Sequence, residues 1–555
     1  MPSVLRSPAL WLGIWLGVGL FAFAPGGRAD AEASGKNEAA STEHPLATQA
    51  AMDTLKRGGN AADAAAAAAL VAGVVGPKSS GIGGGGFAMV LRARAAEPEI
   101  LDFRETAPAA VDSAALAKRP LPWESRGKLT GVPGEPQGLF DVVRRYGKRP
   151  WAELVGVAER LASRGYPVSA FLAEALAEKS AAELKKEPSI AALFFPGGRP
   201  AIAGRLVRNP KLAATLKRLG AEGPGAIYDG AIAQEIVSTA ASAGGNLSLD
   251  DLKRYKVIDR KPIRVRFGDY TVFTMPPPSA GGLLLAQTLG MFAPRELEQL
   301  GWGTGAFSHI LAESFRASFA DRFRYVGDPD FVPVDTAKLL DPARLAKIKK
   351  QLSMDRTHRV QRFTSEEHGT HHMVFVDSEG MVVSLTTTVN RSFGAKLVTP
   401  NSGIFLNDEL DDFDKPSEYA RLGIANGANL PRPFARPTSS MTPTVVLRDG
   451  RPVLALGGSG GMTIATNVAQ LLIGRLVFEL TPEELVKQPR FLVSTRDATL
   501  FLEQSAAPTL SADLVRRGEI IESTNFATGV QIVTGAPGSL EAAADPRKQG
   551  SAQTR

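Results

Sequence analysis

A threonine that follows a glycine at the start of a β-rich stretch has the setting for chemistry. Residues 351–369 are charged and lack apolar periodicity, as an exposed connector does, whereas residues 370–376 are rich in β-forming side chains. An internal threonine is a poor nucleophile because its hydroxyl rarely ionises. If the bond between Gly369 and Thr370 breaks, the new α-amine, with a pKa of about 7.7 to 8, can take the hydroxyl proton. We therefore predict cleavage at this bond, with Thr370 as nucleophile and base.

The residues after Thr370 predict a β-hairpin that brings a second threonine close. Residues 377–380 carry a turn signal, and residues 381–389 predict the second strand. Thr370 then lies opposite Thr387, or opposite Thr388 if the turn holds one extra residue. In either register a second threonine hydroxyl comes within reach, with roughly 5 Å between the Cβ atoms.

The first 31 residues predict a signal peptide. Arg6 is the charged start, residues 9–24 are apolar, and residues 29–31 fit a small-x-small cleavage site. The apolar run is shorter than the roughly 20 residues that a membrane span needs, so periplasmic or secreted export is favoured over an uncleaved anchor. We expect no stable membrane span after signal removal. The chain has no cysteine, which excludes disulfides, thiolate metal sites and a cysteine nucleophile.

Three other functional classes fit the sequence poorly. The net charge is +7, but the basic residues are spread along the 555-residue chain, which argues against nucleic-acid binding. The glycine-rich residues 81–86 follow a predicted helix and precede a predicted strand, the reverse of a phosphate loop, so they indicate close backbone packing instead. His368, His371 and His372 have helical spacing, yet a strand would put the last two on opposite faces, so no metal site is predicted.

Two charged motifs, far apart in the sequence, could each bind an ionic group. Arg104 follows a predicted hairpin of residues 87–92 and 99–103, where its planar fork could bind a carboxylate. Glu409 and Asp412 lie in an acid-rich turn that could receive an ammonium group. A solvated turn and a calcium loop are the alternatives, although the spacing does not match an EF-hand.

A glycine-rich turn predicts an oxyanion hole. Residues 457–461 have the Gly-x-Ser-x-Gly form of a nucleophile elbow, but that fold needs a later histidine, and none of the six histidines follows Ser459. The backbone N–H groups of Gly460 and Gly461, at the start of a predicted helix over residues 462–478, suit a developing negative oxygen better.

The remaining elements are framework. Residues 46–56 predict one helix, and Asn60 is the expected N-cap of an alanine-rich helix over residues 61–75 that should be buried against a sheet. Residues 150–255 are helical in pattern and carry no evident chemistry. Residues 414–436 are loop-like and could form a lid.

Taken together, the motifs resemble the gamma-glutamyltransferase (gamma-glutamyl transpeptidase) family of the N-terminal nucleophile hydrolase superfamily. The similarity runs from about residue 45 to residue 547. It is carried, in chain order, by GNAADA, GIGGGGF, DFRETAP, TGVPGEP, MPPPSAGG, GDPDF, GTHH, NDELDDF, RPTSSMTPT and GGSGG. Each motif is weak alone, and their order makes the resemblance specific.

The resemblance implies an α+β fold, a four-layer αββα sandwich built jointly by a large subunit (residues 32–369) and a small subunit (residues 370–555) cut from one precursor. It implies no cofactor. It also implies roles: Thr370 as nucleophile, Thr388 orienting it, Asn390, Glu409 and Asp412 at the substrate's α-amine, Arg104, Ser439 and Ser440 at its α-carboxylate, and Gly460 and Gly461 as oxyanion hole.

The expected activity is transfer or hydrolysis of the γ-glutamyl group of glutathione and related compounds. A γ-glutamyl ester on Thr370 would be resolved by water or by an amino-acid or peptide acceptor. A related amidase, such as a cephalosporin acylase or a poly-γ-glutamate processing enzyme, is one alternative, and an uncleaved binding protein is another. His371 stands where the family often has a second threonine, and residues 414–436 differ in detail from the family pattern.

Overall fold

The computed structural model describes residues 32–34, 37–358, 369–495 and 497–555. The predicted signal peptide and His368 lie outside the described residues. Within these ranges, no helix combines the length and the apolar character that a membrane crossing requires.

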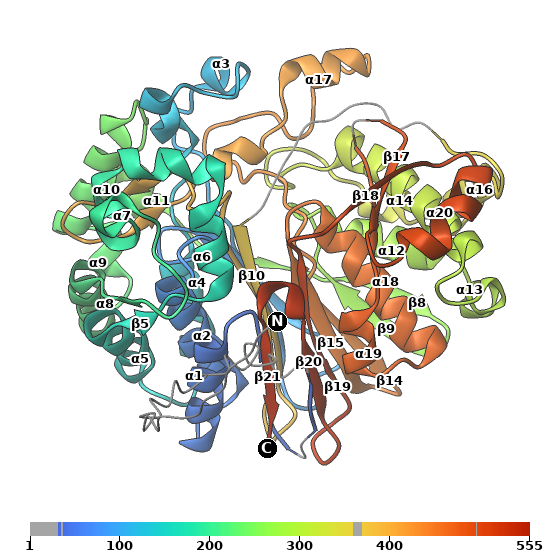
Figure 1. The fold of residues 1–555 in the computed structure, drawn as a ribbon, viewed down its shortest axis with the longest axis horizontal. Helices are drawn as coiled ribbons and strands as arrows, with labels where there is room; N and C mark the ends of the chain where they lie inside the picture. The colour runs from blue at the N-terminus through green and yellow to red at the C-terminus, as the bar shows by residue number, and fades with distance from the viewer. Residues whose placement is uncertain (1–31, 35–36, 359–368, 496) are drawn as a thin grey trace, which may run out of the picture.

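Two seven-stranded sheets form the centre of the molecule (Figure 1). The first has the order β21 (Ser551–Thr554), β2 (Ala39–Thr42), β10 (Gly369–Val376), β11 (Val382–Asn390), β3 (Gly85–Leu91), β4 (Glu99–Phe103) and β7 (Ile258–Arg260). The second has the order β1 (Glu32–Ser34), β20 (Glu541–Ala544), β19 (Gly529–Thr534), β15 (Arg451–Ser459), β14 (Thr444–Arg448), β9 (Tyr270–Thr274) and β8 (Ile263–Phe267).

Three small sheets lie outside this centre. They pair β12 (Leu397–Val398) with β13 (Phe405–Leu406), β5 (Tyr166–Pro167) with β6 (Leu206–Val207), and β17 (Thr499–Glu503) with both β16 (Phe491–Val493) and β18 (Ile520–Thr524).

Helices cover the two sides of the paired sheets (Figure 1). On the side of the first sheet lie α1 (Pro45–Lys56), α2 (Ala61–Val75), α4 (Glu135–Tyr146), α5 (Trp151–Arg164), α6 (Ala170–Ala177), α7 (Pro188–Phe194), α8 (Pro210–Glu222), α9 (Gly225–Tyr228), α10 (Gly230–Ser242) and α11 (Leu249–Arg254). On the other side lie α12 (Gly281–Met291), α13 (Pro294–Leu300), α14 (Gly305–Tyr325), α16 (Pro342–Lys349), α18 (Thr463–Phe478), α19 (Pro482–Lys487) and α20 (Ala507–Arg516). Short elements complete the chain: α3 (Ser113–Leu116), α15 (Thr336–Leu339), α17 (Pro416–Arg421), η1 (Trp123–Leu129), η2 (Lys179–Lys186), η3 (Pro196–Gly198), η4 (Glu409–Asp412) and η5 (Pro546–Lys548).

The alternation of side chains along β10 explains the layering. Met373 and Phe375 belong to the hydrophobic core shared with α1, α2 and α5, whereas Val374 and Val376 belong to the core shared with β14, β15 and α18. Because successive strand residues point to opposite faces, β10 is covered by helices on one face and by the second sheet on the other. This arrangement confirms the predicted αββα sandwich.

The alanine-rich helix α2 has the predicted bounds and burial. Asn60 and Asp63 form a reciprocal capping box at its start, and every residue of the helix is buried. The helix packs on β10 and β11. Small side chains let the helix axis approach the strand that carries Thr370.

Glycines 81–86 serve close backbone packing, as predicted. A Cβ atom at Gly84 would lie 1.9 Å from the carbonyl oxygen of Thr388, and one at Gly86 would lie 2.0 Å from that of Thr386. These distances exclude any side chain, so the loop brings bare backbone against the strand that carries Thr388.

Two predicted boundaries differ from the structure. Strand β15 continues to Ser459, so three of the five residues 457–461 are extended chain, and helix α18 begins at Thr463. The segment 414–436, expected to be loop-like, contains α17, which starts at Pro416, a favoured first helical position.

Candidate active site

The two threonines of the β10–β11 hairpin meet at the carbonyl of Gly369. The pairing puts Thr370 opposite Thr388, which confirms the register with one extra turn residue. The two hydroxyl oxygens are 3.3 Å apart. The Thr370 hydroxyl donates to the Gly369 carbonyl oxygen at 2.7 Å, and the Thr388 hydroxyl donates to the same oxygen at 2.5 Å. The carbonyl oxygen of the peptide bond predicted to break thus accepts hydrogen bonds from two threonine hydroxyls.

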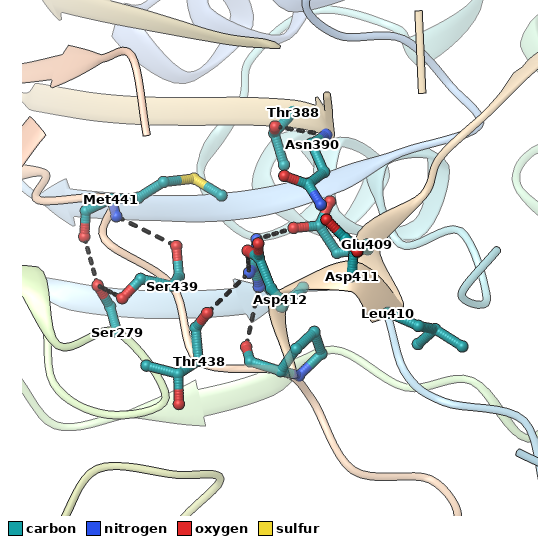
Figure 2. Close-up of polar contacts among 12 residues, drawn as sticks. Ser279, Thr388, Asn390, Glu409, Leu410, Asp411, Asp412, Thr438, Ser439 and Met441 are labelled. Atoms are coloured by element: carbon teal, nitrogen blue, oxygen red, sulfur yellow. Dashed lines mark hydrogen bonds and ion pairs between the residues drawn. The ribbon is translucent and has the colours of Figure 1, made fainter. Parts of the chain in front are cut away.

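Asn390 links this hairpin to the acid-rich turn (Figure 2). Its backbone N–H donates to the Thr388 hydroxyl at 2.9 Å, and its side-chain amide donates to the carbonyl of Asp408 at 3.1 Å. Its φ of 71° lies in the left-handed region, which asparagine tolerates better than most residues. The conformation lets one residue end β11 and orient its amide toward the turn.

Arg104 is buried at the centre of the charged cluster. Its guanidinium forms ion pairs with Glu409 and, at 2.5 Å, with Asp412. It also donates to the carbonyl oxygens of Pro437 and Thr438, both at 3.1 Å. The structure therefore brings together the predicted carboxylate-binding arginine and the two predicted amine-binding acids.

Ser439 lies next to this cluster and beside Ser279, a residue distant in sequence (Figure 2). The Ser279 hydroxyl donates to the carbonyl of Met441 at 2.6 Å, and Ser279 forms a parallel bridge with Ser439. The Ser440 hydroxyl is buried and has no hydrogen-bond partner among the described residues. Ser279 lies in the motif MPPPSAGG, but no sequence pattern indicates a role for this residue.

The glycine turn lies beside Thr370. Lys548 donates from its ammonium to the Thr370 carbonyl at 3.1 Å and to the Ser459 hydroxyl at 2.6 Å. Gly460 and Gly461 follow with φ values of 115° and 67°, a conformation that favours glycine. Because the Ser459 hydroxyl accepts from Lys548, it is not arranged as the nucleophile of an elbow.

Residues 47–554 match the family model described as Gamma-glutamyltranspeptidase. The chain belongs to the gamma-glutamyltranspeptidase family. It is 34% identical over 543 residues to Glutathione hydrolase 2 of Arabidopsis thaliana, covering 92% of this chain and 93% of the relative. It is also 34% identical over 516 residues to the Glutathione hydrolase proenzyme of Escherichia coli strain K12, covering 90% and 89%.

The fold extends this similarity to solved structures. The crystal structure of a cephalosporin acylase from Bacillus halodurans aligns with a TM-score of 0.85 at 25% identity, covering 96% of this chain and 99% of that one. Gamma-glutamyltranspeptidase relatives and an acylase therefore share one architecture, and the residues of the site must separate the two activities.

The buried carboxyl groups around Arg104 outnumber its single guanidinium. Burial raises the pKa of Glu105 to about 8 and that of Asp408 to about 7. Burial also raises the pKa of Glu409, while the adjacent Arg104 opposes the shift. Since Asp412 shares the same guanidinium, the cluster favours the entry of a second cation.

Arg119 holds the acid-rich turn from the other side, a role that sequence reasoning missed. Its guanidinium donates to the carbonyls of Leu410 at 3.0 Å and Phe413 at 2.5 Å, and also to that of Asp411. Leu410 and Asp411 belong to η4 and Phe413 follows it. The carbonyl of Leu410 also accepts from the N–H of Phe413, so Arg119 adds to the bonding that already shapes the turn. No motif marks the residue, because only the folded chain brings residue 119 to residues 410–413.

Replacing Arg119 by alanine should raise the KM for a γ-glutamyl donor about tenfold and change kcat less, because the acids would lose a fixed turn but the threonines would not move. Steady-state kinetics on the cleaved protein checks this. Arg126→Ala is the matched control, since Arg126 is also partly buried but bonds to Glu187 and to the carbonyls of Trp123 and Lys396. An equal KM increase in both variants would contradict the role of Arg119.

The neighbouring histidines face opposite sides of β10, as predicted. His371 Nδ1 lies 2.9 Å from the Ser80 hydroxyl, and His372 Nδ1 lies 2.8 Å from the Thr386 hydroxyl. Ser80 precedes the glycine loop, whereas Thr386 belongs to β11. The two imidazoles are therefore separate, and each contacts a hydroxyl of its own.

Two buried histidines should each oppose the gain in stability that the raised carboxyl pKa values of Glu105 and Asp408 give as the pH falls. Burial lowers the pKa of His44 to about 4 and that of His372 to about 3. Below pH of about 6.5 the unfolded chain takes up protons that the folded chain does not, so the free energy of unfolding falls by about 1.4 kcal/mol per pH unit for each histidine down to about pH 4. Thermal unfolding of the unaltered protein and of His44→Asn, compared between pH 8 and pH 5, checks this. As the pH falls, His44→Asn, which keeps a side chain able to cap α1, should gain stability relative to the unaltered protein.

Proposed function

We propose that the chain cleaves itself between Gly369 and Thr370 and then acts as a γ-glutamyl transferase and hydrolase. The observation that carries this proposal is the pair of threonine hydroxyls on the Gly369 carbonyl, 3.3 Å from each other. The resulting large and small subunits (residues 32–369 and 370–555) would stay associated, because both sheets contain strands from each of them.

Cleavage would begin with attack of the Thr370 hydroxyl oxygen on the Gly369 carbonyl carbon. The Thr388 hydroxyl, which donates to the carbonyl oxygen, stabilises the negative charge that develops there. The C–N bond breaks as the C–O bond forms and the hydroxyl proton passes to the departing nitrogen, which leaves an ester and a free α-amine on Thr370. Water then hydrolyses the ester, releasing the Gly369 carboxylate and restoring the hydroxyl.

Substrate binding would exchange the partners of the charged cluster. A γ-glutamyl headgroup carries an ammonium and a carboxylate, so the ammonium would be received by Glu409, Asp412 and the amide of Asn390. The carboxylate would be received by Arg104 and the hydroxyls of Ser439 and Ser440. The Ser440 hydroxyl, which bonds to none of the residues that the structure describes, supports this assignment, because a buried hydroxyl gains from an incoming acceptor.

The transfer step would use Thr370 alone as nucleophile and base. Its hydroxyl attacks the γ-carbonyl carbon and passes its proton to the α-amine, while the N–H groups of Gly460 and Gly461 face the developing oxyanion. The proton then goes to the leaving amine, and water or an amino acid resolves the ester. Glutathione and related γ-glutamyl compounds are the proposed donors, and export to the periplasm or the medium is the proposed location.

The acylase alternative has a specific test in the same site. A glutaryl group has the carboxylate but no ammonium, so it would leave Glu409 and Asp412 buried without their ligand. A chromogenic γ-glutamyl anilide should therefore be turned over at least about a hundred times faster, by kcat/KM, than a glutaryl-cephalosporin. The reverse preference would assign the chain to the acylases.

A denaturing gel separates the enzyme from an uncleaved binding protein. Purified protein should give two bands, and sequencing of the smaller one should begin at Thr370. One intact band with retained ligand binding would support the binding protein instead.

A further inference from the structure

The mechanism leaves out a buried ion pair that contacts the nucleophile residue. Lys548 and Glu43 are both about 1% exposed, and their charged groups are 3.2 Å apart. The Lys548 ammonium donates to the Thr370 carbonyl, and Glu43 accepts the backbone N–H of His372 at 2.9 Å. The pair thus touches the backbone of Thr370 and His372 directly.

These contacts stand where a neighbouring strand is missing. On its other edge β10 pairs with β2, but only Val374 to Val376 have partners there, opposite Ser41 to Ala39. Beyond Ser41 the chain leaves the strand register and reaches Glu43. The Glu43 carboxylate accepts from the N–H of His372, and the Lys548 ammonium donates to the carbonyl of Thr370. Two side chains therefore continue the hydrogen bonding along this edge of β10 where β2 stops providing it.

Cleavage makes this continuation important. Before it, Thr370 is held through its peptide bond to Gly369, and the β10–β11 register shifts at that same bond. After it, Thr370 is a strand end, and strand ends fray unless their backbone groups are bonded on both sides. The ladder with β11 restrains one side, and Lys548 with Glu43 restrains the other.

We infer that the Lys548–Glu43 pair is a positioning device that holds the new amino terminus in register after cleavage, so that the Thr370 hydroxyl and α-amine stay aligned with the substrate. The inference depends on the proposed self-cleavage. Glu43 precedes the cleavage site and Lys548 follows it, so the pair also joins the two proposed subunits at the nucleophile.

The test uses Lys548→Met together with the double variant Glu43→Gln/Lys548→Met. The double variant carries no lone buried charge, and its glutamine can still accept from His372, but the Thr370 carbonyl has lost its donor. Both variants should still be cleaved, with kcat on a γ-glutamyl anilide reduced about thirtyfold or more and KM within about threefold of the unaltered protein. Hydrogen exchange in the peptide that begins at Thr370 should be faster than in the unaltered cleaved protein.

Several results would overturn the inference. The first is a kcat of the double variant within about threefold of that of the unaltered protein, and the second is a change in KM alone. The third is a variant chain that stays uncut, which would mean that the pair acts before cleavage. Lys548→Arg keeps a donor and should retain more activity than Lys548→Met; equal losses would also count against positioning.

Two controls separate this inference from the proposed function. Lys78 is another buried lysine, and its ammonium lies over the Phe171 ring, as that of Lys548 does. Because Lys78 does not donate to the Thr370 carbonyl, Lys78→Met should have the kcat and KM of the unaltered protein. Cleavage and turnover by the unaltered protein test the proposed function, and only the difference between variants tests the pair.

Discussion

Thr370→Ala should give a protein that stays as one chain on a denaturing gel and shows no measurable turnover of a γ-glutamyl anilide. The change removes the hydroxyl proposed to attack the Gly369 carbonyl, which is also the proposed nucleophile of turnover, and loss of a nucleophile costs on the order of a millionfold in kcat in serine proteases. Gel analysis and initial rates measure the two losses separately.

Two variants serve as its comparison. Thr370→Ser keeps the hydroxyl and should remain cleaved and active. Thr388→Ala removes the hydroxyl that donates to the Gly369 carbonyl, so cleavage should slow by about a hundredfold rather than stop. Normal cleavage and turnover by Thr370→Ala would require another nucleophile and would refute the assignment.

Arg104→Met should raise the KM for a γ-glutamyl donor by about a hundredfold or more and lower the thermal stability. The guanidinium is the proposed carboxylate ligand, and its loss also leaves Glu409 and Asp412 buried with no countercharge from this residue, a change that costs about 3 to 5 kcal/mol when one member of a buried pair is removed. Steady-state kinetics and thermal unfolding measure the two effects.

The contrast with Arg104→Lys and Ser440→Ala gives the prediction its specificity. Lysine keeps the charge without the planar fork and should show an intermediate KM. Ser440→Ala should raise KM only a few-fold and leave stability unchanged, because the Ser440 hydroxyl has no hydrogen-bond partner in the described part of the chain. A KM unchanged in Arg104→Met would count against its role at the substrate carboxylate.

Local patterns in the sequence were sufficient for the elements that depend on near neighbours. Helix α2 with its Asn60 cap and the β10–β11 hairpin both follow from capping, periodicity and turn signals within about twenty residues. The choice between Thr387 and Thr388 was left open, since a single turn residue decides it. The structure selects Thr388.

The charged cluster shows the limit of that reasoning. Composition and family resemblance predict binding roles for Arg104, Glu409 and Asp412. The direct ion pairs of Arg104 with the two acids depend on the fold. The sequence also offered no signal for Arg119, whose guanidinium caps a turn almost three hundred residues later.

By itself, the sequence determined the family through motif order, and the family resemblance implied the layered fold and the proposed role of Thr370. Only the tertiary structure decided which side chains hold that threonine. Glu43 and Lys548 lie near opposite ends of the chain and meet at β10 because strands β2 and β21 are neighbours in one sheet. Strand order is set by packing of the whole core, which no local pattern encodes.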